Sequence, residues 1–597
     1  MKDLWIAAIA RGHNASVCLM HNGKIVFSIE EERLSRFKYD GGPLAAMIKI
    51  KEYTDHIDYL LIAHTMPLSS APIVEYTGDN VYSGLARKLG LMDRKNRSRD
   101  NPKVIDFSNI HHKLHAACAF YRSGFDKAAA LVVDGAGTYI SLTRNGDGTD
   151  PFIGWETETI FDCQYPMNFK TIYKHVGVKE SVSNEVIKHF PSDFHGEVNE
   201  THECVITDRA GIVKTYEAVT QYCGFHAIEA GKTMGLFPYG KSNSEIPPLY
   251  DDSFSVPVSN RNFIVPNYPA NADINFKLNS FLNDHNSEDI TKLKNRRDLA
   301  YAVQKESQDQ VVRLIRKAVK DTGHNKVVIS GGYGLNCVAN YHYLNALKDE
   351  GIEIYVEPIS NDAGTAIGAA MMFYQTLNPG ATVDWAGQGL YLGFEYNYSD
   401  TDIETLVNKY NGTVKDTTDD DVAELLANRN IVTCFQGRSE NGPRALGNRS
   451  ILFDPRQKDG KDFINKVKHR EYFRPFAGSI LEDHAHSWFD LRGMPNSPYM
   501  MYAVNCQPGV AEKIPSIIHV DGTCRIQTVN PTDNKHYYDL IKAFDSKTGV
   551  PILFNTSFNL GGDPLVETLD DALDTLARSE IEYLYLPEYR KLIYIKN

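Results

Sequence analysis

The segment KVVISGGYGLN, residues 326–336, decides the fold of this chain. It begins as a short apolar strand and opens into a glycine-rich turn at 330–336. Strands that end in such turns and lead into helices build α/β layers, whose ligands bind at the strand ends. The segment therefore predicts an α/β protein with a ligand site at this turn.

The same pattern recurs on both sides of this segment. An amphipathic helix is predicted over 298–321, where apolar residues recur at helical spacing. A strand at 352–356 is followed by the turn NDAGT, 361–365, and a helix of small residues. Another strand, 129–133, ends at the turn DGAG, 134–137. These units support the α/β assignment.

The N-terminus reads as a β-meander. Strands are predicted at 4–10, 15–20 and 25–31, with a polar corner at 11–14. The sequence His-Asn-Gly in the turn at 21–24 is a strong hairpin signal.

A linker divides the chain. Residues 375–400 contain proline and glycine and show little periodicity, and helices are predicted beyond them at 401–409 and 418–428. Because 597 residues exceed one ordinary core, we expect two domains, 1–395 and 396–597.

Composition indicates a globular enzyme. The chain is 42% hydrophobic and 23% charged, and its apolar runs are too short to span a bilayer. Nine cysteines without a C-x-x-C pair favour reduced thiols and a cytoplasmic setting. The net charge of −13 argues against coating nucleic acid non-specifically.

One basic run opposes this acidity. Residues 86–103, ARKLGLMDRKNRSRDNPK, carry Arg94, Lys95, Arg97 and Arg99. Such a run is either a solvated loop or a phosphate-binding strip for a polyanionic substrate.

Two histidines are spaced for a metal. His111 and His115 lie four residues apart on a predicted helix, so their imidazoles project from one face. Alone, such a pair is as often structural as metal-binding. Asp134 and Asp362 at the strand-end turns favour a metal site with four ligands.

A second anion site is predicted near the C-terminus. The stretch QGRSENGPRALGNRS, 436–450, sets Arg438, Arg444 and Arg449 among glycines, and Lys468 and Arg474 follow. Guanidinium forks and glycine N–H groups bind oxyanions, although a salt-bridged structural loop has the same composition. The polar blocks at 519–525 and 555–559 favour the anion pocket.

The glycine turns suit a nucleotide. Their backbone N–H groups would cradle phosphates, although no P-loop sequence is present. His13, at a strand end, could act as a general base, although a loop histidine is more often a surface residue. The candidate nucleotide-binding residues are Gly135, Glu229, Lys232, Gly331, Gly332 and Asn336.

Together, these blocks resemble the NodU/CmcH-type O-carbamoyltransferases, which include nodulation, cephamycin and tobramycin enzymes. The resemblance extends over nearly the whole chain. Two positions depart from the family pattern, which has Asp in place of Asn14 and a smaller residue in place of Tyr333. The blocks that carry the resemblance are 12–14, 31–33, 111–115, 134–135, 229–240, 330–336, 361–364, 437–450, 519–525 and 555–559.

The resemblance implies an N-terminal actin/hexokinase-like (ASKHA) domain of two duplicated lobes and a C-terminal YrdC-like α/β domain. It implies that carbamoyl phosphate loses phosphate in the C-terminal pocket, and that the carbamate attacks ATP, with Mg²⁺, to give carbamoyl-adenylate and pyrophosphate. An acceptor hydroxyl then attacks the carbamoyl carbon in the N-terminal domain, and AMP leaves.

The family's roles carry over to matching positions. His13 matches the base that takes the acceptor's proton. His111, His115 and Asp362 match the ligands of a metal, by analogy iron(II), with Asp134 as a further ligand. The residues that match the carbamoyl-phosphate and adenylate pocket are Arg444, Lys468, Arg474, Arg525, Ser557 and Asn559.

The acceptor and two other classes stay open. Phage-encoded relatives and the basic run suggest hydroxymethylcytosine in DNA, which would require base flipping in a duplex. A sugar, nucleoside or antibiotic hydroxyl is the alternative, and a homodimer is compatible with either. A nucleotide-binding module or a sugar kinase of the same fold would lack the second anion pocket.

Overall fold

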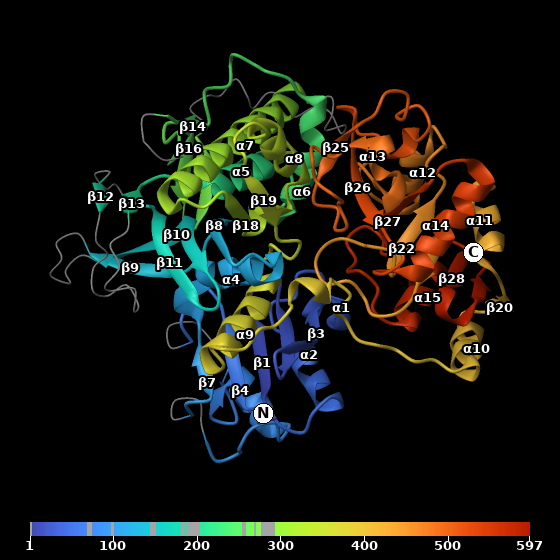
Figure 1. Ribbon diagram of the computed structural model, residues 1–597, viewed down its shortest axis with the longest axis horizontal. Coiled ribbons are helices and arrows are strands. Elements are labelled where there is room, and N and C mark those ends of the chain that lie inside the picture. The colour runs from blue at the N-terminus through green and yellow to red at the C-terminus, as the bar shows by residue number, and fades with distance from the viewer. Residues whose placement is uncertain are drawn as a thin grey trace. The chain divides into compact units, whose positions relative to one another are not determined.

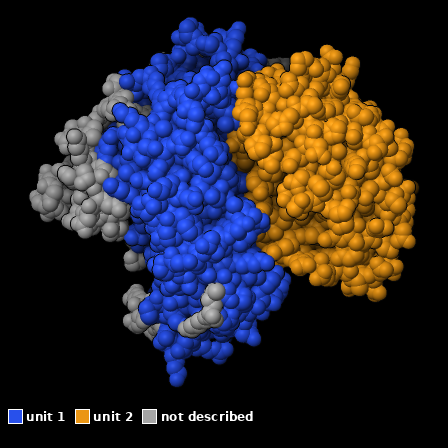
Figure 2. All heavy atoms as spheres, in the orientation of Figure 1, with its two compact units in different colours: residues 1–31, 40–388 blue, residues 32–39, 389–597 orange. Residues whose placement is uncertain are grey.

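The chain folds into two compact units, coloured separately in Figure 2. The first comprises residues 1–31 and 40–388, and the second comprises 32–39 and 389–597. The break between Gln388 and Gly389 lies inside the linker expected from sequence. The computed structural model describes residues 3–68, 75–96, 101–143, 151–180, 185–187, 203–252, 258–267, 270–275 and 293–596.

The first unit begins with a five-stranded sheet (Figure 1). Its order is β3-β2-β1-β4-β7, formed by β3 (Lys24–Glu30), β2 (Ser16–His21), β1 (Trp5–Ala10), β4 (Tyr59–Ala63) and β7 (Val104–Asp106). The first three strands form the predicted antiparallel meander, whereas β4 and β7 run parallel to β1. Helix α2 (Leu44–Lys49) lies against β2.

A second sheet repeats this topology. Its central order is β11-β10-β8-β18-β19, from β11 (Asn168–Val178), β10 (Pro151–Gln164), β8 (Lys127–Val133), β18 (Lys326–Ser330) and β19 (Glu353–Val356). Strands β8, β10 and β11 are antiparallel neighbours, and β18 and β19 run parallel to β8. Two sheets with the same order and directions are the duplicated lobes of the actin/hexokinase architecture, so this expectation is confirmed.

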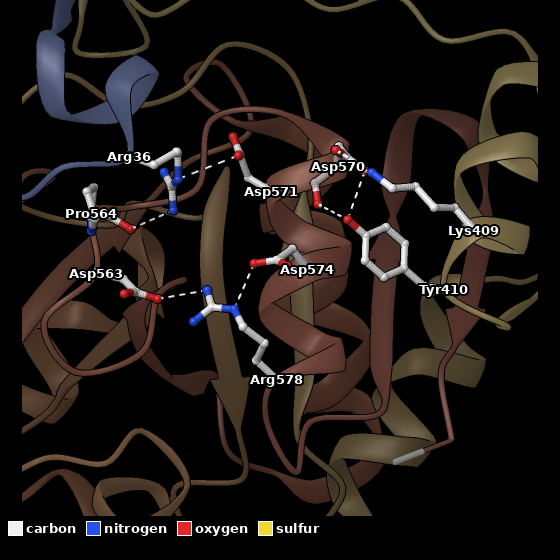
Figure 3. A pocket seen from close by; sticks show the side chains of 9 residues that line it. All are labelled: Arg36, Lys409, Tyr410, Asp563, Pro564, Asp570, Asp571, Asp574 and Arg578. Carbon is white, nitrogen blue, oxygen red and sulfur yellow. Dashed lines mark hydrogen bonds and ion pairs between the residues drawn. The ribbon is translucent and has the colours of Figure 1, made fainter.

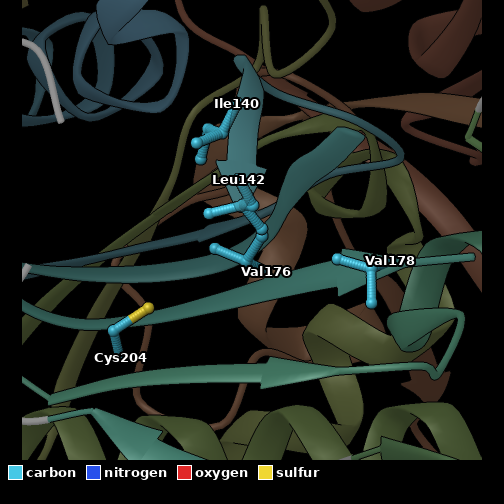
Figure 4. Close-up of a cluster of buried hydrophobic side chains, with 5 residues drawn as sticks. All are labelled: Ile140, Leu142, Val176, Val178 and Cys204. Atoms are coloured by element: carbon cyan, nitrogen blue, oxygen red, sulfur yellow. The ribbon is translucent and has the colours of Figure 1, made fainter. Parts of the chain in front are cut away.

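A small apolar cluster extends the second sheet (Figure 4). Ile140 and Leu142 of β9 (Tyr139–Thr143) pack on Val176 and Val178 of β11 and on Cys204 of β13 (Glu203–Thr207). All five side chains are buried. Burial of this apolar surface stabilises the outer strands of the sheet.

Two helices pack closely against each other, one on each sheet: α9 (Ala363–Leu377) contacts β1 and α4 (His111–Ser123) contacts β18. Gly368 permits the contact between the helices, since a Cβ there would lie 2.0 Å from the Leu114 carbonyl oxygen. The predicted helix at 298–321 is α7 (Lys294–Thr322), and α7 packs on α5 (Gly211–Tyr222).

The other elements of the first unit are short. They include α3 (Val81–Lys88), η2 (Ser108–Ile110), η3 (Ala227–Glu229), α6 (Ala230–Leu236), η4 (Phe237–Tyr239), η7 (Gly332–Leu335) and α8 (Cys337–Ala346). Among the described residues, no helix is both long and apolar enough to cross a membrane.

The second unit is an α/β unit around one ten-stranded sheet. The strand order is β20-β29-β28-β21-β22-β27-β23-β26-β25-β24. Its α10 (Asp400–Lys409) and α11 (Asp419–Ala427) match two predicted helices, and Ser399 and Thr418 cap their N-termini. Similarity of this unit to YrdC stays a prediction. The strands are β20 (Thr413–Asp416), β21 (Val432–Phe435), β22 (Arg449–Phe453), β23 (Ala477–Leu481), β24 (Phe489–Asp490), β25 (Ala503–Cys506), β26 (Thr523–Val529), β27 (Ile552–Ser557), β28 (Tyr583–Leu586) and β29 (Lys591–Tyr594), and the remaining helices include α12 (Gly460–Val467), α14 (Lys535–Thr548) and α15 (Leu569–Ala577).

The segment 32–39 joins this second unit, which the sequence did not predict. Arg33 donates hydrogen bonds to the Glu440 and Gly442 carbonyl oxygens, at 3.1 and 2.9 Å. Arg36 donates to the carbonyl oxygens of Leu565 and its neighbour, at 2.7 and 3.2 Å. The segment is therefore held by guanidinium contacts with backbone.

Candidate active site

Four predicted metal ligands come together in the first unit. His111 and His115 lie one turn apart on α4, Asp134 follows β8, and Asp362 immediately precedes α9. Asp362 Oδ1 lies 3.6 Å from Nε2 of both His111 and His115, and Asp134 Oδ2 lies 3.8 Å from His111 Nε2. One ligand atom from each residue falls within 4.8 Å of the others.

The chemistry of this cluster fits a divalent ion. Nε2 of His111 and of His115 is buried and has no hydrogen-bond partner among the described residues. Burial alone would lower the pKa of His111, but Asp134 and Asp362 raise it to about 10. Two imidazoles and two carboxylates are a donor set that transition metals accept.

Neighbouring groups orient the ligands. The Ser330 hydroxyl lies 3.4 Å from His115 Nδ1, and the Gly332 N–H donates to Asp134 Oδ1 at 2.8 Å. Gly331 has φ +89°, and a Cβ there would lie 2.4 Å from the Val133 carbonyl oxygen. The glycine-rich turn after β18 therefore holds Asp134 through its backbone.

A buried polar chain supports the start of α4. Thr138 Oγ1 accepts from the His111 N–H at 3.1 Å, and the Thr138 N–H donates to Glu156 Oε2 at 2.8 Å. Lys174 donates to the other oxygen of Glu156. Such partners fix ligand positions, and sequence reasoning did not identify them.

His13 lies beside the cluster. It follows β1, its side chain is half exposed, and its Nδ1 lies 3.9 Å from Asp362 Oδ2. Gly12 has φ +118°, a backbone conformation that favours glycine. The predicted base is thus accessible and adjacent to a candidate ligand.

Arg11 and His64 lie close to His13, and the sequence reasoning gave neither a role. The Nε2 of His64 and Asp362 Oδ2 lie 3.9 and 4.0 Å from the position of a Cβ on Gly12. Burial, helped by the positive charge of Arg11, lowers the pKa of His64 to about 4. A lone polar residue directly after the apolar strand β4 was the available signal for His64.

The candidate nucleotide residues divide into two groups. Gly332 donates to Asp134, the residue before Gly135, and Gly331 lies against the Val133 backbone. The Asn336 side chain instead caps α8 by accepting from the Ala339 N–H at 3.1 Å. Glu229 and Lys232 form an ion pair of 2.9 Å, Glu229 at the end of η3 and Lys232 on α6, which packs on α5.

Sequence reasoning missed two polar residues on α5. A Cβ on Gly135 would lie 3.1 Å from Glu217 Oε1 and 3.3 Å from Lys214 Nζ. Lys214 and Glu217 also pair with each other at 2.6 Å. A carboxylate and an ammonium group therefore face the Asp134–Gly135 turn.

The arginine-rich loop is organised by a buried carboxylate. Glu440 Oε1 accepts from the N–H groups of Leu446, Asn448 and Arg449 at 2.7, 2.8 and 3.2 Å. Arg449 is fully buried, stacks 3.7 Å from the Phe435 ring centroid and donates to backbone carbonyls.

The loop's arginines therefore differ in role. Arg438, like Arg449, donates to backbone, with the Gly393 and Leu392 carbonyl oxygens at 2.7 and 3.1 Å. These two arginines fix the shape of the loop, as expected if they belong to a structural loop. Arg444, which lies between them in the sequence, is half-buried.

The predicted anion pocket of the second unit contains crowded cations. Lys468 is buried and donates to the Ser557 carbonyl oxygen and to Asn559 Oδ1. Burial and the charges of Arg470 and Arg474 lower the pKa of Lys468 well below its usual value. Like charges gathered in this way are typical of a site that binds an anion.

Strand register places the rest of this pocket. Ala477 pairs with both Arg525 of β26 and Asn555 of β27, and Ser557 ends β27. Nε of Arg525 is buried without a hydrogen-bond partner in the described part of the chain. Asn555 Nδ2 donates to the Ala445 carbonyl oxygen at 3.2 Å, which ties the Arg444 segment to the same strands.

The basic run is only partly described. Arg94 and Lys95 are exposed, whereas Arg97 and Arg99 lie outside the described residues. Arg87 is buried and bonds to the Thr77 carbonyl oxygen at 3.2 Å, so it is a structural residue.

A pocket of about 320 Å³ in the second unit is lined by paired charges (Figure 3). Arg578 pairs with Asp563 and Asp574 at 2.9 and 2.7 Å, and Lys409 bonds to Asp570 at 2.8 Å. These carboxylates are neutralised by their own neighbours, and the pocket holds none of the predicted site residues.

Comparison with known proteins identifies the family. Residues 70–371 match the family model described as Carbamoyltransferase N-terminus, and 423–591 match Carbamoyltransferase C-terminus. Nodulation protein NolNO of Sinorhizobium fredii is 30% identical over 97% of this chain and 78% of its own length. Nodulation protein NolO of Bradyrhizobium diazoefficiens is 32% identical over 79% of this chain and 77% of its own.

Among solved structures, full-length HypF in its phosphate- and nucleotide-bound form aligns with 64% of this chain and 57% of its own. The identity is 15% and the TM-score is 0.35, too low to establish a shared fold over that length. The two family models and the long sequence matches agree, and the chain belongs to the carbamoyltransferase family.

Proposed function

We propose that this carbamoyltransferase uses ATP and carbamoyl phosphate to form carbamoyl-adenylate, and then transfers the carbamoyl group to an acceptor hydroxyl. The first stage is assigned to the second unit and the transfer to the first. The observation that carries the proposal is the presence of two chemically different sites, a crowded cation pocket and a histidine–carboxylate cluster beside His13.

In the first stage, water hydrolyses carbamoyl phosphate to carbamate and inorganic phosphate. The carbamate oxygen attacks the α-phosphorus of ATP, and pyrophosphate departs. Arg444, Lys468, Arg474 and Arg525 would neutralise charge on the phosphoryl oxygens, and Ser557 and Asn559 position Lys468.

In the second stage, the acceptor hydroxyl attacks the carbamoyl carbon. His13 takes the hydroxyl proton, the C–O bond to the carbamoyl group forms, and the bond to AMP breaks. Asp362, 3.9 Å from His13 Nδ1, would orient the imidazole and stabilise its charged form.

His111, His115, Asp134 and Asp362 would hold a divalent metal, for which we propose iron(II) by analogy. When bound, the metal would anchor nucleotide phosphates, with Mg²⁺ accompanying ATP. Gly135, Gly331 and Gly332 would lie along the same phosphates, and Glu229, Lys232 and Asn336 would be nearby nucleotide contacts.

For the acceptor, we propose hydroxymethylcytosine in DNA. The support is the basic run, in which Arg94 and Lys95 are exposed. Neutralising Arg94, Lys95, Arg97 and Arg99 is expected to weaken DNA binding and reduce its salt dependence. Unchanged transfer after that substitution would contradict this assignment.

The test combines the protein with ATP and carbamoyl phosphate. Release of pyrophosphate and phosphate without acceptor, and AMP formation with acceptor, are the expected results. Transfer is then read by intact-mass or nucleoside analysis with hydroxymethylcytosine DNA and with a sugar, nucleoside and aminoglycoside panel. ADP as the sole nucleotide product would indicate a kinase, and tight nucleotide binding without turnover would indicate a binding module.

A chelator that binds iron(II) and leaves excess Mg²⁺ free separates the two sites. Removing the metal of the histidine–carboxylate cluster in this way is expected to stop transfer but leave pyrophosphate release, because the cation pocket contains none of the candidate metal ligands. Loss of both activities at the same chelator concentration would argue against two independent sites.

A further inference from the structure

Arg11 is a cation without a counter-charge among the described residues. Its side chain forms no hydrogen bond or ion pair with any residue in the described part of the chain, and its Nη1 is buried. The backbone around it is fixed, because the Arg11 N–H donates to the Ala63 carbonyl oxygen at 3.2 Å. Leaving a buried guanidinium nitrogen unpaired destabilises a fold, so the half-buried Arg11 side chain points to a ligand that supplies the missing acceptor.

His64 offers a second donor at the same place. Its Nδ1 accepts from the Met66 N–H at 3.1 Å, which leaves Nε2 as the nitrogen that carries hydrogen. That Nε2 lies 3.9 Å from the Cβ position of Gly12, and Asp362 Oδ2 lies 4.0 Å from the same position. The His64 donor therefore faces the space beside Gly12, His13 and the metal cluster.

The two side chains are neighbours. Ala10 of β1 pairs with Ala63 of β4, so Arg11 and His64 are the next residues along two neighbouring parallel strands, and the charge of Arg11 helps lower the pKa of His64. Together they present a charged donor and a neutral donor on the His13 side of Asp362.

We propose that Arg11 and His64 form an oxyanion subsite that binds a phosphate oxygen of a substrate in the transfer site. This inference rests on the proposed function of that site. The phosphate belongs either to the acceptor, which would then be a phosphorylated compound or a nucleotide of a nucleic acid, or to the adenylate. In either case, Arg11 and His64 hold the substrate so that the reacting hydroxyl and His13 meet.

Inorganic phosphate is the probe, added to the full chain by calorimetric titration. The Arg444→Ala background weakens phosphate binding in the second unit, and Arg11→Met and His64→Leu are added to it. We expect Arg11→Met to weaken the remaining phosphate binding about ten-fold, and His64→Leu to weaken it less, because an ionic hydrogen bond is the stronger of the two. Arg316→Met, which removes an exposed arginine paired with Glu350, is the matched control and should change nothing.

The results separate the proposal from its alternatives. Phosphate affinity unchanged by Arg11→Met overturns the subsite. Failure of Arg11→Met to fold also overturns it, because the variant removes a cation that has no partner in the part of the protein that the structure describes. We expect its unfolding midpoint without phosphate to be equal or higher.

Saturating AMP distinguishes the two sources of phosphate. If AMP abolishes the Arg11-dependent binding, the adenylate phosphate occupies the subsite. If that binding persists beside AMP, the subsite serves the acceptor. Pyrophosphate release by the unaltered protein tests the proposed function separately, since it depends on the second unit alone.

Discussion

Replacing Gly368 by alanine should disturb the metal cluster without touching a ligand. The added Cβ would lie 2.0 Å from the Leu114 carbonyl oxygen, whereas real Cβ atoms essentially never approach within 3.0 Å. The added Cβ is held rigidly by the backbone of α9 and its partner is a backbone oxygen of α4, so the two helices must separate by at least 1.0 Å, the difference of these distances. Helix α4 carries His111 and His115, and Asp362 immediately precedes α9, so the ligands separate with the helices.

Two magnitudes follow from this shift. Overpacking of this kind costs about 1–3 kcal/mol of unfolding free energy. Metal–ligand distances tolerate only about 0.2 Å, and errors in ligand support weaken metal binding about 10–100-fold. We therefore expect Gly368→Ala to lose both stability and metal affinity.

The assays are urea unfolding of the apo-protein and titration with a divalent metal, with Mn²⁺ as an air-stable probe. Gly380→Ala is the control, because no atom lies within 4 Å of its added Cβ. If Gly368→Ala unfolds and binds Mn²⁺ like the unaltered protein, the reasoning from close helix contact is refuted. If the unaltered protein binds no divalent metal, the metal proposal fails while the stability prediction stands.

Three further changes test the two sites. His13→Asn should abolish transfer and leave pyrophosphate release unchanged, because only the second stage uses that imidazole; transfer at the native rate would show that His13 is not the base. Arg444→Ala should stop both stages while the protein stays folded. Arg449→Ala should instead lower the unfolding midpoint, because the Arg449 guanidinium donates hydrogen bonds to several backbone carbonyl groups. Circular dichroism and the pyrophosphate assay distinguish these two outcomes. The lowered pKa of Lys468 means that the unfolded chain binds a proton that the folded chain lacks, so unfolding free energy should rise with pH between that lowered pKa and 10.5. Lys468→Met should flatten this rise in urea unfolding at a series of pH values, and an equal slope in both proteins would show that Lys468 is charged when folded.

Sequence periodicity predicted the elements that carry the candidate site. Short apolar runs and the His-Asn-Gly turn predicted the N-terminal meander, and helical spacing predicted α7 and the helix that carries His111 and His115. His111 and His115 were recognisable because four residues make about one helical turn, and Asp134 and Asp362 because they follow apolar strands. The cluster could be predicted because each of its residues lies in a short sequence pattern, either a helical turn or the end of a strand.

Other features depend on contacts between distant segments. The residue pattern of the arginine-rich loop fits both an anion pocket and a structural loop. Only the fold shows that Arg438 and Arg449 donate hydrogen bonds to backbone carbonyl groups. A role for Arg11 could not be predicted from sequence, because it depends on the absence of a partner for its side chain among the described residues. The strands β10 and β11 had no clear sequence signal, because both are buried along most of their length and show little alternation.

The passage of residues 32–39 into the second unit limits how the protein can be divided for experiments. A fragment that starts near residue 396 would lack Arg33 and Arg36. The carbonyl groups of Glu440 and Leu565, which accept hydrogen bonds from these arginines, would lose their donors. Those carbonyls belong to the loop of Arg444 and to the approach to α15. An isolated C-terminal half should therefore be supplied with the missing peptide, by grafting or in trans, before its inactivity is interpreted.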